Sequence, residues 1–190
     1  MSDRSVPAEY FNSLYENDPD PWRFASSPYE KAKYAATLDA IGEARIGRAW
    51  EVGCSIGVFT AALADLCDTL LAVDVAEAAL AQARSRCAQK PNVTLERCRV
   101  PAEWPERRFD LIVFSEVLYF LSAPDIRLTA RRSVESLDPE GRIVLVNWTR
   151  ENGQALSGDA AADAFIAAAP ELVPLKRRRR PGYRLDLLRA

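Results

Sequence analysis

Residues 50–60 read WEVGCSIGVFT, and residues 70–75 read LLAVDV. The two segments together predict a strand, a glycine-rich turn, a helix and a second strand that ends in an acid. Glycine carries no Cβ, so such a turn lets backbone N–H groups approach a ligand closely, and the following helix begins with unpaired donors. An acid at the tip of the next strand can take both hydroxyls of a ribose. The pattern therefore predicts a nucleoside-containing ligand at the carboxyl ends of parallel strands.

Two other enzyme classes carry similar turns. As Gly53-x-Ser55-x-Gly57, the turn matches the nucleophile elbow of serine hydrolases, whose serine needs a histidine to take its proton. The chain contains no histidine, which excludes the usual hydrolase and leaves only a lysine as a conceivable base. A dinucleotide turn should read G-x-G-x-x-G. Here Ser55 replaces the middle glycine and the next glycine comes one position early, so a nicotinamide-dependent oxidoreductase is a weaker alternative.

The acid Glu51 distinguishes these classes further. It lies two residues before Gly53, where it would repel a pyrophosphate and would suit a ligand with a positive end. S-adenosylmethionine has an ammonium, a sulfonium and a ribose but no phosphate. Glu51-x-Gly53-x-Ser55-x-Gly57 with Asp74 resembles the first two motifs of the class I S-adenosylmethionine-dependent methyltransferases, and residues 109–121, FDLIVFSEVLYFL, resemble the fourth-strand motif of that family.

This resemblance covers about residues 45–150 and implies S-adenosyl-L-methionine as cofactor, S-adenosyl-L-homocysteine as product, and no metal. Two classes remain open beside it, a module that binds the cofactor without transferring a methyl group and the oxidoreductase. The residues expected to bind the cofactor are Trp22, Glu51, Gly53, Cys54, Ser55, Gly57, Phe59, Asp74, Val75, Arg99, Val100 and Ser115.

A segment before the first strand narrows the resemblance. Residues 20–23 read DPWR, and together with the motifs above they are similar to the nodulation-protein S group of methyltransferases. Members of that group N-methylate the deacetylated terminal glucosamine of chito-oligosaccharide signals. The resemblance therefore implies a small-molecule acceptor, an amino sugar or another small amine.

One position departs from the family pattern. After the third strand the family commonly places an acid that takes the adenine amino group, and Arg99 stands at the matching position. Arginine has no acceptor. The alternatives are adenine contacts from the backbone of Arg99 and Val100, a contribution from Glu103, weak cofactor binding, or an exposed arginine without a role.

Methyl transfer is an in-line displacement that mainly requires alignment of a neutral nucleophile with the methyl–sulfur bond. Without histidine, a proton acceptor must be a carboxylate, a tyrosine or water. Glu116, at the tip of the fourth strand, is the first candidate, and Tyr119 is expected to orient it. The alternative for Glu116 is a ribose, backbone or helix-cap contact.

The composition is that of an ordinary globular protein. The chain has 190 residues, 48% of them hydrophobic and 27% charged, with a formal charge of −2, which argues against general affinity for nucleic acid. No apolar run reaches the roughly 18 residues of a membrane span and no leader is visible, so we expect a cytoplasmic protein. The sequence does not determine its oligomeric state. The cysteines lack a C-x-x-C pair and are expected to be reduced and packed; they are Cys54, Cys67, Cys87 and Cys98.

Alternating patterns predict an α/β fold, a doubly wound, mostly parallel seven-stranded sheet that ends in an antiparallel hairpin around Pro181-Gly182. We expect one methyltransferase domain, 1–190, composed of an N-terminal helical and aromatic segment (1–45), a cofactor-binding core (46–150) and a C-terminal helix and hairpin (151–190). The aromatic segment is expected either to form a lid over the ligand or to cover a helix. The basic run 176–180 is expected to be a solvated strand end or, alternatively, to capture an anionic group of the substrate. The expected strands are 49–52, 69–74, 93–97, 110–115, 141–147, 172–175 and 183–188, and the expected helices are 28–42, 58–66, 76–89, 124–137 and 158–168.

Overall fold

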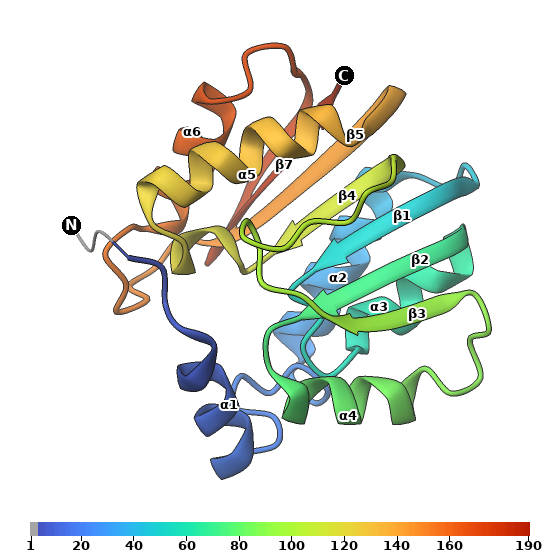
Figure 1. Cartoon of the computed structure of the whole chain (residues 1–190), viewed down its shortest axis with the longest axis vertical. Helices are drawn as coiled ribbons and strands as arrows, with labels where there is room; N and C mark the ends of the chain where they lie inside the picture. The colour runs from blue at the N-terminus through green and yellow to red at the C-terminus, as the bar shows by residue number, and fades with distance from the viewer. Residues whose placement is uncertain (1–3) are drawn as a thin grey trace. The chain divides into compact units, whose positions relative to one another are not determined.

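A computed structural model describes residues 4–190, which divide into two compact units. Residues 7–99 form the first unit, and residues 4–6 with 100–190 form the second. Helices and strands alternate along most of the chain (Figure 1). Among the described residues the strands number seven, in the order β3-β2-β1 within the first unit and β4-β5-β7-β6 within the second.

The first unit is a parallel sheet with helices. Its strands pair in parallel, β1 with β2 and β2 with β3. The strand β3 is at the edge, and its side chains are only half-buried or exposed, as its alternating sequence predicts. The elements of this unit are α1 (Ala8–Asn17), α2 (Pro28–Ile41), β1 (Ile46–Val52), α3 (Val58–Leu63), the 3-10 turn η1 (Ala64–Leu66), β2 (Cys67–Asp74), α4 (Glu77–Arg86) and β3 (Val93–Arg97).

The second unit has one parallel and two antiparallel strand pairs. The strand β4 pairs in parallel with β5, and the hairpin of β6 and β7 adds to β5 in antiparallel fashion. Residues 111–114 of β4 are fully buried, which confirms a strand covered on both faces. The elements are β4 (Phe109–Ser115), η2 (Leu118–Phe120), α5 (Ala123–Glu135), β5 (Leu137–Trp148), α6 (Gly158–Ala167), β6 (Val173–Arg180) and β7 (Tyr183–Arg189).

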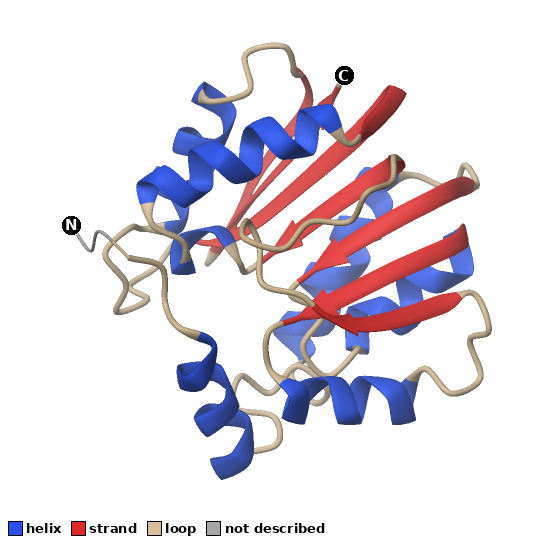
Figure 2. Ribbon diagram, in the orientation of Figure 1, coloured by secondary structure: helices blue, strands red, loops and turns tan. Residues whose placement is uncertain are grey.

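The predicted fold class, with its seven strands, mostly parallel, and its antiparallel C-terminal hairpin, is confirmed (Figure 2). Two details differ. The helix α1 was not expected. It begins after Pro7 without a side-chain cap, and although Glu9 lies in its first turn, its last turn holds no basic residue. The strand β6 runs through the basic segment to Arg180, so this segment is part of the strand itself and does not extend beyond its end.

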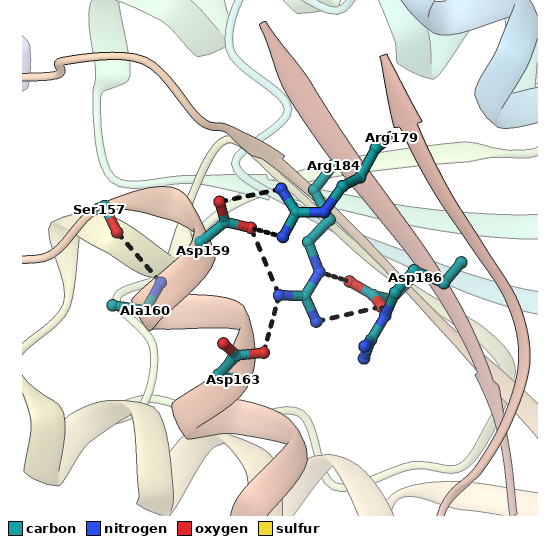
Figure 3. Close-up of polar contacts among 8 residues, drawn as sticks. Ser157, Asp159, Ala160, Asp163, Arg179, Arg184 and Asp186 are labelled. Carbon is teal, nitrogen blue, oxygen red and sulfur yellow. Dashed lines mark hydrogen bonds and ion pairs between the residues drawn. The ribbon is translucent and has the colours of Figure 1, made fainter. Parts of the chain in front are cut away.

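Alternate side chains of the basic segment form ion pairs with the rest of the hairpin and with α6. Arg177 pairs with Asp186, and Arg179 forms a two-pronged pair with Asp159 (Figure 3). Arg184 lies at the centre, 1% exposed, with bonds to Asp186, Asp163 and Asp159. We call these residues the ionic network; its members are Asp159, Asp163, Arg177, Arg179, Arg184 and Asp186.

The cysteines are free, as expected, and the described residues include no helix long and apolar enough to cross a membrane. Cys54, Cys67 and Cys87 are buried, and Cys98 is partly exposed. Burial raises the pKa of each of the three buried thiols, so they stay protonated.

Candidate active site

The glycine-rich turn between β1 and α3 is held by bonds within the first unit. The N–H groups of Gly53 and Cys54 both donate to the Val73 carbonyl, and the Gly57 N–H donates to the Cys54 carbonyl. Gly57 adopts a φ of 78°, and a Cβ there would lie 2.9 Å from the Cα of Ala83 in α4. Only glycine allows this approach, so Gly57 lets the turn pack closely against α4.

Asp74 ends β2 and lies against the turn. Its Oδ2 accepts from the Ser55 N–H at 2.8 Å, and its Oδ1 accepts from the Ala76 N–H at 2.9 Å. Burial raises the pKa of this carboxyl, and the backbone donors oppose the rise. The structure therefore brings together two predicted site residues, Ser55 and Asp74, through a direct hydrogen bond.

Glu51 is the second buried acid of the turn region, 2% exposed. Burial raises its pKa to about 7, and the Asp74 carboxylate adds to the rise. The Thr60 hydroxyl lies close enough to offset part of this rise, although its geometry falls short of a hydrogen bond. Among the described residues, Glu51 Oε2 has no hydrogen-bond partner. A buried carboxylate of this kind is stabilised by a cationic group of a ligand.

Two further predicted residues of the turn region are packed. Cys54 is buried, and its burial raises the pKa of its thiol, with a smaller contribution from the negative charge of Asp74. This environment suits a small packed side chain and does not activate a thiolate. Phe59 in α3 is also buried and packs against Tyr34 in a tilted arrangement, with ring centroids 5.3 Å apart. Their packing supports the shape of the turn.

The aromatic segment before β1 contacts the turn through Tyr15, a residue that was not predicted. Tyr15 is 5% exposed and packs with Ile56 and the start of α4, and its hydroxyl lies 2.5 Å from Ser55 Oγ. Trp22, a predicted site residue, is 37% exposed and meets the Tyr15 ring edge-on at 5.6 Å. The segment thus contacts the turn and also packs against α4.

The second unit places Glu116 and Tyr119 together, as predicted. The Tyr119 hydroxyl donates to Glu116 Oε2 at 2.8 Å, and the Trp148 backbone N–H donates to the same oxygen at 2.7 Å. Glu116 has a positive φ of 61°, and its own N–H continues the β4–β5 ladder by donating to Val146. Tyr119 therefore orients Glu116. The Trp148 contact was not foreseen, because it comes from the end of the neighbouring strand β5, 32 positions later in the sequence.

Four predicted cofactor residues lie near strand ends. Val75 follows β2 and is half-buried, and Arg99 is exposed two residues after β3. The chain beside Arg99 is attached to the turn region, because the Cys98 N–H donates to the Asp74 carbonyl. Val100 is buried in the second unit, and Ser115, at the end of β4, is half-buried.

Comparisons with known proteins agree with these features. The model of the nodulation protein S (NodS) family matches residues 12–182. Nodulation protein S of Bradyrhizobium diazoefficiens is 33% identical over 84% of this chain and 78% of its own length, and that of Rhizobium tropici is 31% identical over 81% and 66%.

Solved structures show the same fold. A structure described as a putative methyltransferase from Pseudomonas syringae has 32% identity and a TM-score of 0.74, over 85% of this chain and 99% of its own. N-methyltransferase NodS from Bradyrhizobium japonicum WM9, in complex with S-adenosylhomocysteine, has 24% identity and a TM-score of 0.83, over 97% and 98%. The chain belongs to the nodulation protein S family and is an S-adenosylmethionine-dependent methyltransferase.

Proposed function

We propose that this enzyme N-methylates a small amine, an amino sugar or the free terminal amine of a chito-oligosaccharide, and that the turn region of the first unit binds the cofactor. The observation that carries the cofactor assignment is the pair of buried acids, Glu51 and Asp74, beside a fixed glycine-rich turn. Glu51 Oε2 would accept from the ammonium of S-adenosylmethionine, and Asp74 from the ribose hydroxyls.

The other cofactor contacts follow from this assignment. Gly53, Ser55 and Gly57 would give the cofactor close access to the backbone, and Val75 and Trp22 would contact its apolar surfaces. A Trp22 face near the sulfonium would add a cation–π attraction of about 1 kcal/mol. Roles for Arg99, Val100 and Ser115 in holding the cofactor stay predictions from the motifs.

For the acceptor we assign Glu116 and Tyr119. The Glu116 carboxylate has a fixed orientation because two donors hold one of its oxygens, and it can accept a hydrogen bond from the attacking amine and later its proton. An amine that has lost solvent needs only weak help from a base, since desolvation lowers its pKa. The match to the nodulation protein S family supports methylation of a nitrogen, because the solved NodS structure is that of an N-methyltransferase. The amino sugar is what the resemblance of the sequence motifs implies.

Transfer of a labelled methyl group from S-adenosylmethionine tests this function. The acceptors are glucosamine, a chito-oligosaccharide with a free terminal amine, and the same oligosaccharide fully N-acetylated. We expect label only in the two compounds with a free amine. Transfer to the acetylated compound would overturn the amine assignment, and failure with both free amines while S-adenosylhomocysteine still binds would overturn the amino-sugar acceptor.

The Glu116→Gln variant tests the acceptor residues. We expect it to lower kcat by about tenfold to a hundredfold, because the amide accepts no proton, while the Kd for S-adenosylhomocysteine stays unchanged. Glu106→Gln, at an exposed glutamate of the same unit, is the matched control. Equal turnover in the two variants would remove Glu116 from the chemistry.

A further inference from the structure

Tyr15 is a buried polar residue that the proposed chemistry does not use. It lies in α1, 5% exposed, among Ile56, Ala76 and Ala79, with Phe11 and Phe24 packed at the margin. Burial, together with the nearby Asp74 charge, raises its pKa, so the phenol keeps its proton. A buried hydroxyl needs a hydrogen-bond partner, and here the partner is Ser55 Oγ at 2.5 Å.

Ser55 occupies the conformationally demanding position of the glycine-rich turn. Its φ is 51°, in the left-handed region that favours glycine, so its conformation costs free energy that surrounding contacts must offset. Two contacts hold it in place, one at each end of the residue. Its N–H donates to Asp74 Oδ2, and its side chain bonds to Tyr15.

These bonds form a chain from the N-terminal helix to the acid at the end of β2. Tyr15 Oη bonds to Ser55 Oγ, the Ser55 N–H bonds to Asp74 Oδ2, and Asp74 Oδ1 accepts from the Ala76 N–H. A carboxylate with both oxygens held has its remaining lone pairs aimed in fixed directions. The orientation of Asp74 therefore depends on the conformation of Ser55, and that conformation depends in part on Tyr15.

The helix α1 is itself anchored on α4, which keeps Tyr15 in place (Figure 1). Asn12 Oδ1 accepts from the Glu77 N–H at the start of α4, and the Gln82 side chain donates to the Pro19 carbonyl at 2.8 Å. The Trp22 ring meets Tyr15 edge-on. The Tyr15 ring thus has packing partners of its own, which a phenylalanine would keep.

We propose that Tyr15 is a positioning residue for the cofactor, which acts through Ser55 to hold the glycine-rich turn and Asp74 in the binding geometry. This inference rests on the assignment of the turn and Asp74 as the cofactor site. Tyr15 acts on the affinity for the cofactor and not on methyl transfer itself.

The test compares Tyr15→Phe, Ser55→Ala and the double variant with Tyr10→Phe. Tyr10 lies in the same helix but is 44% exposed, which makes it the matched control. The measurements are the Kd for S-adenosylhomocysteine by calorimetry, the KM for S-adenosylmethionine and kcat with an accepted amine, and the melting temperature of the free protein.

We expect Tyr15→Phe to raise Kd and KM about tenfold, the effect of one buried hydrogen bond, with kcat within about twofold of the parent. Tyr10→Phe should match the parent. The Kd of the double variant should not exceed the higher of the two single-variant Kd values, because both substitutions remove the same bond. Multiplied effects in the double variant, an unchanged Kd in Tyr15→Phe, or a fall in kcat with KM unchanged would overturn the proposal.

A fourth variant, Asp74→Ala, separates this proposal from the assignment beneath it. If Asp74→Ala binds S-adenosylhomocysteine as tightly as the parent, the cofactor site has been assigned wrongly and the Tyr15 proposal fails with it. If Asp74→Ala loses binding while Tyr15→Phe keeps it, the cofactor site stands and only the role of Tyr15 is refuted.

Discussion

The ionic network of the second unit and the two acids beside the glycine-rich turn both hold ionisable groups out of water, but their partners differ. In the network, Arg184 and Asp186 are each 1% exposed and bond to each other at 2.7 Å (Figure 3). Burial works against the Arg184 charge, but Asp186 and Asp163 outweigh it and raise its pKa. Beside the turn, Glu51 and Asp74 are two like charges, and burial raises the pKa of both.

This difference distinguishes a structural cluster from a binding site. A buried charge with a well-oriented opposite charge is satisfied within the fold. A buried carboxylate that lacks a cationic partner lowers the stability of the free protein and gains from a ligand that supplies one. Mutation of the network should therefore change the stability of the protein, and mutation of the acid pair should change its affinity for the ligand.

The largest effect is expected for Arg184→Met. Asp186 stays buried with exposed Arg177 as its remaining ion-pair partner among the described residues, so the free energy of unfolding should fall by about 3–5 kcal/mol. Urea unfolding measures this loss, and the double variant Arg184→Met, Asp186→Leu should regain most of it. The Kd for S-adenosylhomocysteine in the folded fraction should not change. A higher Kd would contradict the division between the two clusters.

Asp74→Ala should act mainly on affinity. We expect at least a hundredfold weaker binding of S-adenosylhomocysteine, because two charge-assisted hydrogen bonds to the ribose are lost. Calorimetry gives the Kd. Asp68→Ala is the control on the same strand, since the Asp68 side chain is 61% exposed and pairs with exposed Arg45. Equal Kd values for the two variants would refute the ribose assignment.

The raised pKa of Glu51 predicts pH dependence. The folded protein binds this proton more tightly than the unfolded chain, so the free energy of unfolding should fall as pH rises from about 4.5 to about 7. A cofactor ammonium favours the carboxylate, so affinity for S-adenosylhomocysteine should rise with pH and level off above about 7. Between pH 6 and 8 the gain should be about tenfold.

Glu51→Gln should remove this pH dependence, and Glu96→Gln, at an exposed position of β3, should keep it. Calorimetry at pH 6 in buffers with different ionisation enthalpies counts the proton released on binding. Release of no proton by the parent protein would show that Glu51 does not face a cationic group of the ligand.

The sequence predicted the elements of the acid pair better than those of the network. Glu51, the glycines and Asp74 lie within one strand–turn–helix–strand unit, so local motifs determine how they meet. The network joins α6, β6 and β7, and its pairs depend on the hairpin register that places Arg177 opposite Asp186. A run of five basic residues gives no sign of which members face α6.

The same limit explains the residues that were missed near the predicted site. Tyr15 reaches Ser55 across 40 positions of sequence, and the Trp148 N–H reaches Glu116 across 32. Neither contact belongs to a motif with fixed spacing. The strands β1 to β4 and β7 were predicted to within three residues because apolar runs mark them, whereas β5 begins and β6 ends in polar sequence that carries no such mark. The helix α1 has no side-chain cap at its start and was not predicted.

The smallest expected effect concerns Arg99, the residue that departs from the family pattern. Arg99 is exposed after β3, in a segment fixed by the Cys98 N–H bond to the Asp74 carbonyl. If the adenine amino group lies near this position, Arg99→Asp supplies the missing acceptor and should tighten S-adenosylhomocysteine binding by up to about tenfold. Arg99→Ala removes the guanidinium without adding an acceptor, so its Kd should stay within about twofold of the parent.

Calorimetry on the two Arg99 variants distinguishes the alternatives. A gain in Arg99→Asp alone places the adenine beside residue 99, equal gains in both variants mean that the arginine only hinders entry, and no change in either assigns adenine binding to the backbone or to another residue.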